Sequence, residues 1–186
     1  MKILAAVHSV LDSPDSANAA MASGVRRQVV YTESVDKKGE GMSKLTLKQA
    51  NAIIENAFLK SHQLKTKPLG VVVIDDGGNI VSAQRDDGAS LFRIDVGRGK
   101  AWAALAIGRS SRELAKRAKE NPNFFLSMAA AADGKFIPQT GGVLIKDDAG
   151  TVLGAVGSSG ASADEDEGCC IAGIESVGLK TDSSAT

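Results

Sequence analysis

The chain has 186 residues, enough for one domain and too few for two of ordinary size. Its 22 basic and 22 acidic residues balance, no basic run stands out, and every apolar run is far shorter than a membrane span. The sequence therefore indicates neither a nucleic-acid partner nor a membrane partner. Two cysteines, Cys169 and Cys170, are neighbours; a disulfide between neighbours is strained, and free thiols favour a cytoplasmic location.

Residues 1–42 differ from the rest and are expected to be disordered or a non-native extension. Residues 37–41 read Lys-Lys-Gly-Glu-Gly, which purine-rich codons resembling a ribosome-binding site can encode, so Met42 is a candidate natural start. A weak signal peptide within residues 1–20, which would imply export, is the alternative interpretation. The domain is expected over residues 43–180 and a short tail over residues 181–186.

The first signals of regular structure are a helix and a hairpin. Thr46 and Gln49 form a capping-box pattern, and apolar residues at helical spacing behind them predict an amphipathic helix to about residue 62. Residues 71–74 are all β-branched and predict a buried strand. The Asp-Asp-Gly-Gly-Asn turn that follows leads to a return strand over residues 80–85.

The middle of the chain is predicted to be helical. Residues 93–107 are rich in Gly and Ala, which predicts a helix that can be approached closely and that favours close packing between subunits. Ser110 and Glu113 repeat the capping box before a short charged helix that ends before Pro122. Residues 124–132 predict a further helix.

A second hairpin and a last helix complete the pattern. Residues 143–146 and 151–156 are the expected strands, and Ser162 with Glu165 forms a third capping box that opens a helix to about residue 177. Two hairpins with helices around them predict an α+β fold, an antiparallel sheet with flanking helices.

Several motifs, in this order, resemble the GlcG/HbpS family of the DUF336 type. They are VIDDGG from residue 73, RDDGA from residue 85, GKA from residue 99, GGVLI from residue 141 and GAVGSSG from residue 154. Leu144 and Ser158 depart from the family pattern, which commonly has Pro and an apolar residue there. The resemblance covers residues 45–179 and implies a profilin-like (GlcG-like) sheet, a homo-oligomer, and binding of haem, a corrinoid or another small molecule.

Seven residues are candidates for contact with a small anionic ligand: Arg85, Asp87, Arg98, Lys100, Ser159, Gly160 and Asp166. Arginine can bind a carboxylate or propionate through two hydrogen bonds, although an Arg85–Asp87 pair that ties the loop to the sheet is equally compatible. Lys100 either meets the ligand or lies along the helix surface. The turn that contains Ser159 and Gly160 either binds an anion or is structural.

The residues that ligate metals and haem give weaker signals. The consecutive acidic residues 164–167 point in different directions on a helix, so no metal site is predicted. Haem iron is usually held by His, Met, Cys or Tyr. His62, Met128 and the two cysteines are the donors available in the domain, and Tyr31 lies in the extension.

The sequence favours a non-enzymatic, oligomeric protein that binds haem or a related tetrapyrrole, because no catalytic constellation is complete. The alternative is an enzyme or accessory protein in the catabolism of a small, glycolate-type organic acid. There Arg85 would anchor a carboxylate and Lys100 or Asp166 would move protons. A scaffold whose pocket is filled by Phe92, Trp102 or Phe124 is the third interpretation.

Overall fold

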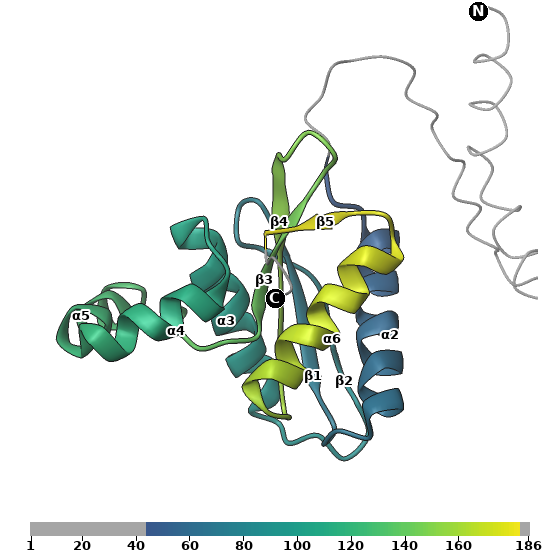
Figure 1. Cartoon of the computed structure of the whole chain (residues 1–186), viewed down its shortest axis with the longest axis horizontal. Coiled ribbons are helices and arrows are strands. Elements are labelled where there is room, and N and C mark those ends of the chain that lie inside the picture. Colours follow the sequence, from purple (N-terminus) through teal and green to yellow (C-terminus); the bar gives the residue numbers. More distant parts are fainter. Residues whose placement is uncertain (1–43, 183–186) are drawn as a thin grey trace, which may run out of the picture. The chain divides into compact units, whose positions relative to one another are not determined.

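The computed structural model describes residues 44–182, and the expected extension over residues 1–42 lies outside that part. The described helices are α2 (Leu47–Leu64), α3 (Arg93–Ile107), α4 (Ser111–Glu120), α5 (Pro122–Ala131) and α6 (Ala163–Ser176). The described strands are β1 (Gly70–Asp75), β2 (Ile80–Arg85), β3 (Gly142–Lys146), β4 (Val152–Ser159) and β5 (Lys180–Thr181). They form one antiparallel sheet in the order β2-β1-β4-β3-β5 (Figure 1).

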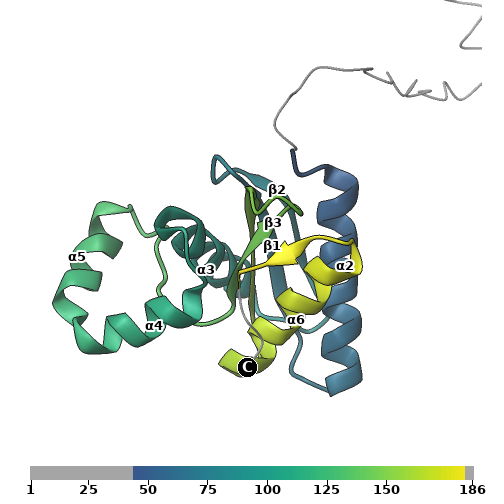
Figure 2. The same cartoon turned by 45° about the horizontal axis from the view of Figure 1, so that its top comes forward.

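Helices cover both faces of this sheet (Figures 1 and 2). Successive side chains of a strand point to opposite faces, so β1 contributes to two cores. Val71 and Val73 pack into the core that α2 and α6 close, whereas Val72 and Ile74 pack under α3. This arrangement confirms the predicted α+β fold with an antiparallel sheet and flanking helices.

Two of the three predicted capping boxes form. Thr46 accepts a hydrogen bond from the backbone N–H of Gln49, and Ser162 accepts one from Glu165. The box expected at Ser110 is wrong, since the Ser110 side chain makes no capping hydrogen bond. The carboxylate of Glu113 instead accepts a hydrogen bond from Arg109 Nη1 at 2.6 Å. The Arg109 guanidinium thus binds the Glu113 carboxylate, which a capping box would use to accept a hydrogen bond from the backbone.

The small residues of α3 lie against the sheet. A Cβ atom at Gly97 would be 2.9 Å from the carbonyl oxygen of Gly157 in β4, and one at Gly157 would overlap the carbonyl oxygen of Gly97. The close approach predicted for this helix is therefore confirmed, and its partner is the sheet of the same subunit. The glycine-rich face of α3 consequently gives no support to the expected subunit contact.

The C-terminal part differs from the sequence pattern in two places. Strand β4 continues to Ser159, so residues 157–159 pair with β1 and do not form a free turn. Strand β5 was not predicted; it pairs with β3, and the Asp182 carboxylate accepts a hydrogen bond from Leu144 N at 3.2 Å. None of the described helices combines the length and hydropathy that crossing a membrane requires.

Candidate functional site

Most candidate residues lie at one end of the sheet, where β1 begins and β2 and β4 end. Gly70 pairs with Arg85 on one side and with Ser159 on the other, so these three residues form a row across the strands. A Cβ atom at Gly70 would be 2.8 Å from the Cβ of Arg93, which places the start of α3 over this row. The topology thus gathers residues that are far apart in the sequence.

Lys100 and Asp166 form a buried ion pair at this end. Lys100 Nζ lies 2.7 Å from Asp166 Oδ2 and donates a second hydrogen bond to the carbonyl oxygen of Ser158 at 3.0 Å. The relative exposures of the two residues are 6% and 2%. Gly141 makes room for the pair, since a Cβ atom there would be 2.9 Å from Lys100 Nζ. The ion pair therefore joins α3 to α6 around the ends of β3 and β4.

The burial of this pair determines its chemistry. Burial raises the pKa of the Asp166 carboxyl, while the charge of Lys100 and its hydrogen bond act in the opposite direction. Neither residue is exposed to a substrate. This favours a structural role over the proton transfer that the organic-acid alternative requires.

The raised pKa predicts how Asp166 affects the pH dependence of stability. The folded state holds the Asp166 proton to a higher pH than the unfolded chain, whose carboxyl has its ordinary pKa of 3.8. Stability therefore falls as the pH rises from that value through the raised pKa, because the folded state then loses its excess proton. Urea unfolding of wild type and Asp166→Asn from pH 3.5 to 7 should show the wild type losing stability relative to the variant as the pH rises. A wild-type curve that rises relative to the variant would contradict it.

Cys169 and Cys170 are buried thiols on the inner side of α6. Burial raises the pKa of Cys169 to about 11 and that of Cys170 to about 12. Both are consequently protonated near neutral pH, and the thiolate is the form that binds metals or attacks substrates. They act here as small core residues, and Cys170 Sγ also donates a weak hydrogen bond to the carbonyl oxygen of Gly141 at 3.5 Å.

Arg85, Asp87 and Arg98 remain outside the buried network. Arg85 and Asp87 are exposed, and within residues 44–182 neither side chain has a hydrogen-bond or ion-pair partner. The Arg85–Asp87 pair that the sequence left open is thus not formed. Arg98 Nε is buried and without a hydrogen-bond partner in the same range. Arg98 and Lys100 do not converge, because residues two apart on a helix point to different sides.

Ser159 and Gly160 do not form an exposed anion-binding turn. Ser159 is buried at the end of β4, where its hydroxyl lies 3.4 Å from Arg93 Nη1. A Cβ atom at Gly160 would overlap the carbonyl oxygen of Pro68, and the N–H of Ser158 donates to the carbonyl oxygen of Gly141 at 2.9 Å. Sheet pairing and close packing therefore take up the space and the N–H groups that an anion would need.

The acidic residues 164–167 are divided among three environments. Arg112 Nη2 donates to Asp164 at 2.6 Å and Arg112 Nε to Glu167 at 2.6 Å. Glu165 completes the α6 cap, and hydrogen bonds from Ser162 lower the pKa of its carboxyl. Asp164 and Glu167, one turn apart on α6, share Arg112, whereas Asp166 faces Lys100 and Glu165 faces Ser162, so the four carboxylates do not gather at one point.

The structure also joins His62 at the end of α2 to Asp86, the residue after β2. The two side chains meet at 2.7 Å between Nε2 and Oδ2, and the other carboxylate oxygen of Asp86 accepts from the N–H of Asp87 at 3.0 Å. The His62 side chain is 60% exposed. Sequence reasoning noted His62 as a donor but not its partner, because the two residues are 24 positions apart with no motif that links them.

Comparison with known proteins identifies relatives of this fold. The family model described as "Haem degrading protein HbpS-like" matches residues 45–175, whereas none of the curated proteins matches the chain. A crystal structure of a PduOC–haem complex has a TM-score of 0.68 at 23% identity, covering 76% of this chain and 100% of that one. Klebsiella pneumoniae ORFY, of the DUF336 family, has 0.66 at 22% identity, covering 76% and 96%.

A third crystal structure, of a double mutant of Streptomyces reticuli HbpS, has a TM-score of 0.63 at 24% identity and covers 82% of this chain and 98% of that chain. At such identities the likeness in structure shows the fold alone, and the family rests on the match over residues 45–175. The chain belongs to the HbpS-like (DUF336) family.

Proposed function

We propose that this protein binds haem or a related tetrapyrrole, that His62 would hold the iron, and that the protein self-associates. The observation that carries the haem proposal is the exposed imidazole held by Asp86 at 2.7 Å. Histidines that ligate metals commonly place their second ring nitrogen against a carboxylate, which fixes the ring and raises its basicity. His62 Nδ1 has no partner among residues 44–182, so it is the nitrogen available to iron.

The other potential donors fit haem iron less well. Both cysteines are buried with raised pKa values, which disfavours the thiolate. Met128 lies on α5, which Figure 1 shows on the opposite side of the sheet from α2, the helix that carries His62. His62 is the single histidine among the described residues, and the PduOC–haem complex of similar fold supports haem as the ligand class.

Arg85 is the best-placed partner for a haem propionate. It precedes Asp86 directly, is exposed, and has no ion-pair partner within residues 44–182. Asp87 directly follows Asp86, whereas Arg98, whose Nε has no hydrogen-bond partner among residues 44–182, lies on α3 over the face of the sheet opposite α2. Lys100, Asp166, Ser159 and Gly160 lie in the buried network, where they would support this corner of the sheet rather than contact the ligand.

A haemin titration of the full chain, followed by absorbance, tests the proposal. The wild type should give a saturable Soret shift at about one equivalent per subunit. His62→Ala should weaken binding by more than about tenfold and change the EPR signal of the iron, and added imidazole should restore that signal. Asp86→Asn should weaken binding by about 10–100-fold, as expected for the loss of a carboxylate that orients a metal ligand.

Two controls make this result specific to the His62 site. Gln63→Ala changes the neighbouring exposed residue of α2, and His8→Ala removes the other histidine of the chain. Both should bind haemin as the wild type does, while Arg85→Ala should bind more weakly with the iron signal unchanged. A flat titration would refute haem binding, and a wild-type response of His62→Ala would refute the assigned ligand.

A further inference from the structure

Two arginines lie beside the row of residues at the end of the sheet. Gly70 of β1 pairs with Arg85 of β2 and with Ser159 of β4, and directly opposite residues of an antiparallel pair share one face of the sheet. A Cβ atom at Gly70 would be 2.8 Å from the Cβ of Arg93, the first residue of α3. Arg85, Ser159 and Arg93 therefore surround a glycine on the α3 face of the sheet. Arg85 and Arg93 are hereafter called the arginine pair.

The two arginines are close enough to contact one ligand. Opposite residues of an antiparallel pair have Cβ atoms about 4.5–5.5 Å apart, so the Cβ of Arg85 lies at about this distance from the Gly70 position. Because the Arg93 Cβ is 2.8 Å from the same position, the two arginine Cβ atoms are within about 8 Å of each other. Each carries its guanidinium on a flexible aliphatic stem, which lets both groups reach the same ligand.

Neither guanidinium has a carboxylate partner within residues 44–182. The Arg85 side chain is exposed and makes no hydrogen bond, and the half-buried Arg93 side chain makes one, at 3.4 Å between its Nη1 and the Ser159 hydroxyl. The buried carboxylate at this end, Asp166, is already held by Lys100 at 2.7 Å. An arginine offers five N–H donors in a fork that matches a carboxylate. The arginine pair is therefore suited to carboxylates that come from outside the chain.

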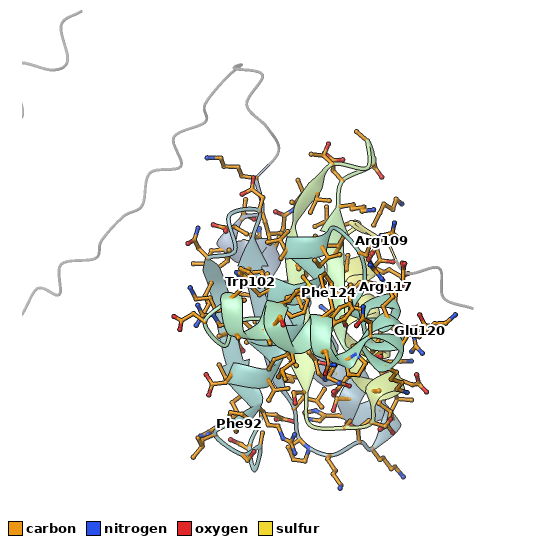
Figure 3. All side chains as sticks on the ribbon, turned by 90° about the vertical axis from the view of Figure 1, so that its left-hand side faces the viewer. Phe92, Trp102, Arg109, Arg117, Glu120 and Phe124 are labelled. Atoms are coloured by element: carbon orange, nitrogen blue, oxygen red, sulfur yellow. The ribbon has the colours of Figure 1, made fainter. Side chains whose placement is uncertain are left out.

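The arginine pair lies at the same end of the sheet as His62. His62 belongs to the last turn of α2 and contacts Asp86, the residue directly after Arg85, at 2.7 Å. Figure 3 shows Phe92, the residue before Arg93, at the lower end of the described part, where α2 finishes in Figure 1. The imidazole and the two guanidinium groups therefore gather at one end of the sheet.

The imidazole and the arginine pair face opposite sides at that end. The N–H of Asp86 donates to the carbonyl oxygen of Leu69 at 2.9 Å, so the strand pairing continues to this residue. Successive side chains of a strand point to opposite faces, so Arg85 faces α3, whereas Asp86 points towards α2 and His62. A ligand that contacts all three groups extends past the strand ends and carries its metal and its anionic groups well apart. Haem has this form, with iron at the centre of the ring and two propionates at one edge.

We infer that Arg85 and Arg93 bind the propionates of haem, which adds Arg93 to the ligand-binding residues. The inference rests on the proposed haem binding and names its carboxylate site. Two guanidinium groups match two propionates in number and in charge, and each can bind a carboxylate through two hydrogen bonds. Ser159, which is 3% exposed, accepts the hydrogen bond that orients the Arg93 side chain.

Titrations of the full chain with haemin and with haemin dimethyl ester, followed by absorbance, test the arginine pair. The ester keeps the iron and the ring but carries no carboxylate. The wild type should bind haemin at least about tenfold more tightly than the ester, because the ester cannot form the charge-assisted hydrogen bonds. Arg93→Gln and Arg85→Gln should each weaken haemin binding by about three- to tenfold, with the affinity for the ester and the EPR signal of the iron unchanged.

Two further variants separate a direct contact from a loss of structure or of net charge. Arg93→Lys keeps the charge without the fork and should keep part of the preference for haemin. Lys116→Gln removes one positive charge from the exposed side of α4 and should bind both compounds as the wild type does. A wild type that binds neither compound would refute the haem proposal. Haemin binding in which Arg93→Gln keeps the full preference over the ester would refute the arginine pair alone.

Discussion

Replacing Lys100 by Met is expected to lower the free energy of unfolding by about 3–5 kcal/mol, because it leaves the Asp166 carboxylate buried without its cation. The pair is 2.7 Å apart, and both side chains are almost fully removed from water. The protein cannot solvate the remaining charge, so the variant must protonate Asp166 or open the contact between α3 and α6. Either outcome destabilises the folded state.

A double-mutant cycle measures the interaction free energy between Lys100 and Asp166 separately from the interactions of each residue with its surroundings. Asp166→Asn should cost less than Lys100→Met, because the raised pKa of Asp166 means that the fold favours an uncharged group over the carboxylate at this position. The remaining cost is the Lys100 ammonium left without its counter-ion, while the amide can keep the hydrogen bond from Ala161 N, which is 3.1 Å long. The double variant Lys100→Met with Asp166→Asn buries no charge and should lose much less than the sum of the single losses. Urea unfolding measures all four proteins; additive losses would show that the two residues act independently.

The sequence predicted those elements whose signals are local. The Asp-Asp-Gly-Gly-Asn turn and the β-branched run before it placed the first hairpin, and the apolar stripe behind Thr46 placed α2. Strand β5 was not predicted because it has only two residues. It forms by pairing with Ile145 and Lys146, and this pairing depends on the fold and not on the sequence of β5 itself. The capping box predicted at Ser110 does not form, because Arg109 binds the Glu113 carboxylate and Arg109 lies outside the Ser-x-x-Glu pattern.

The candidate site was predictable in its composition and not in its contacts. Lys100 and Asp166 were both selected, yet they are 66 positions apart, and only the fold shows that they meet. The same holds for His62 and Asp86. Ser159 and Gly160 were selected as a free turn, but the extension of β4 by three residues buries them. Local patterns therefore identify which residues can carry chemistry, while burial decides which of them stay available to a ligand.

Gly157→Ala should strongly destabilise the protein, because it adds a methyl group between β4 and α3. The added Cβ would overlap the carbonyl oxygen of Gly97 and would lie 2.8 Å from Ala101 N, so it meets the backbone of α3, which cannot rotate away as a side chain can. Overpacking of this kind costs about 1–3 kcal/mol, and the upper end is expected here because a whole helix must shift.

Gly168→Ala is the matched control for this change. A Cβ atom at Gly168 meets nothing within 4 Å, and the residue lies inside α6, so alanine should stabilise the protein by about 0.5–1 kcal/mol through its better helix propensity. Urea midpoints of the two variants should therefore move in opposite directions from the wild type. If Gly157→Ala were as stable as the wild type, α3 could not lie as close to β4 as the structure places it. The position of Lys100 beside Asp166 would then be wrong as well, because Lys100 is one turn along the same helix.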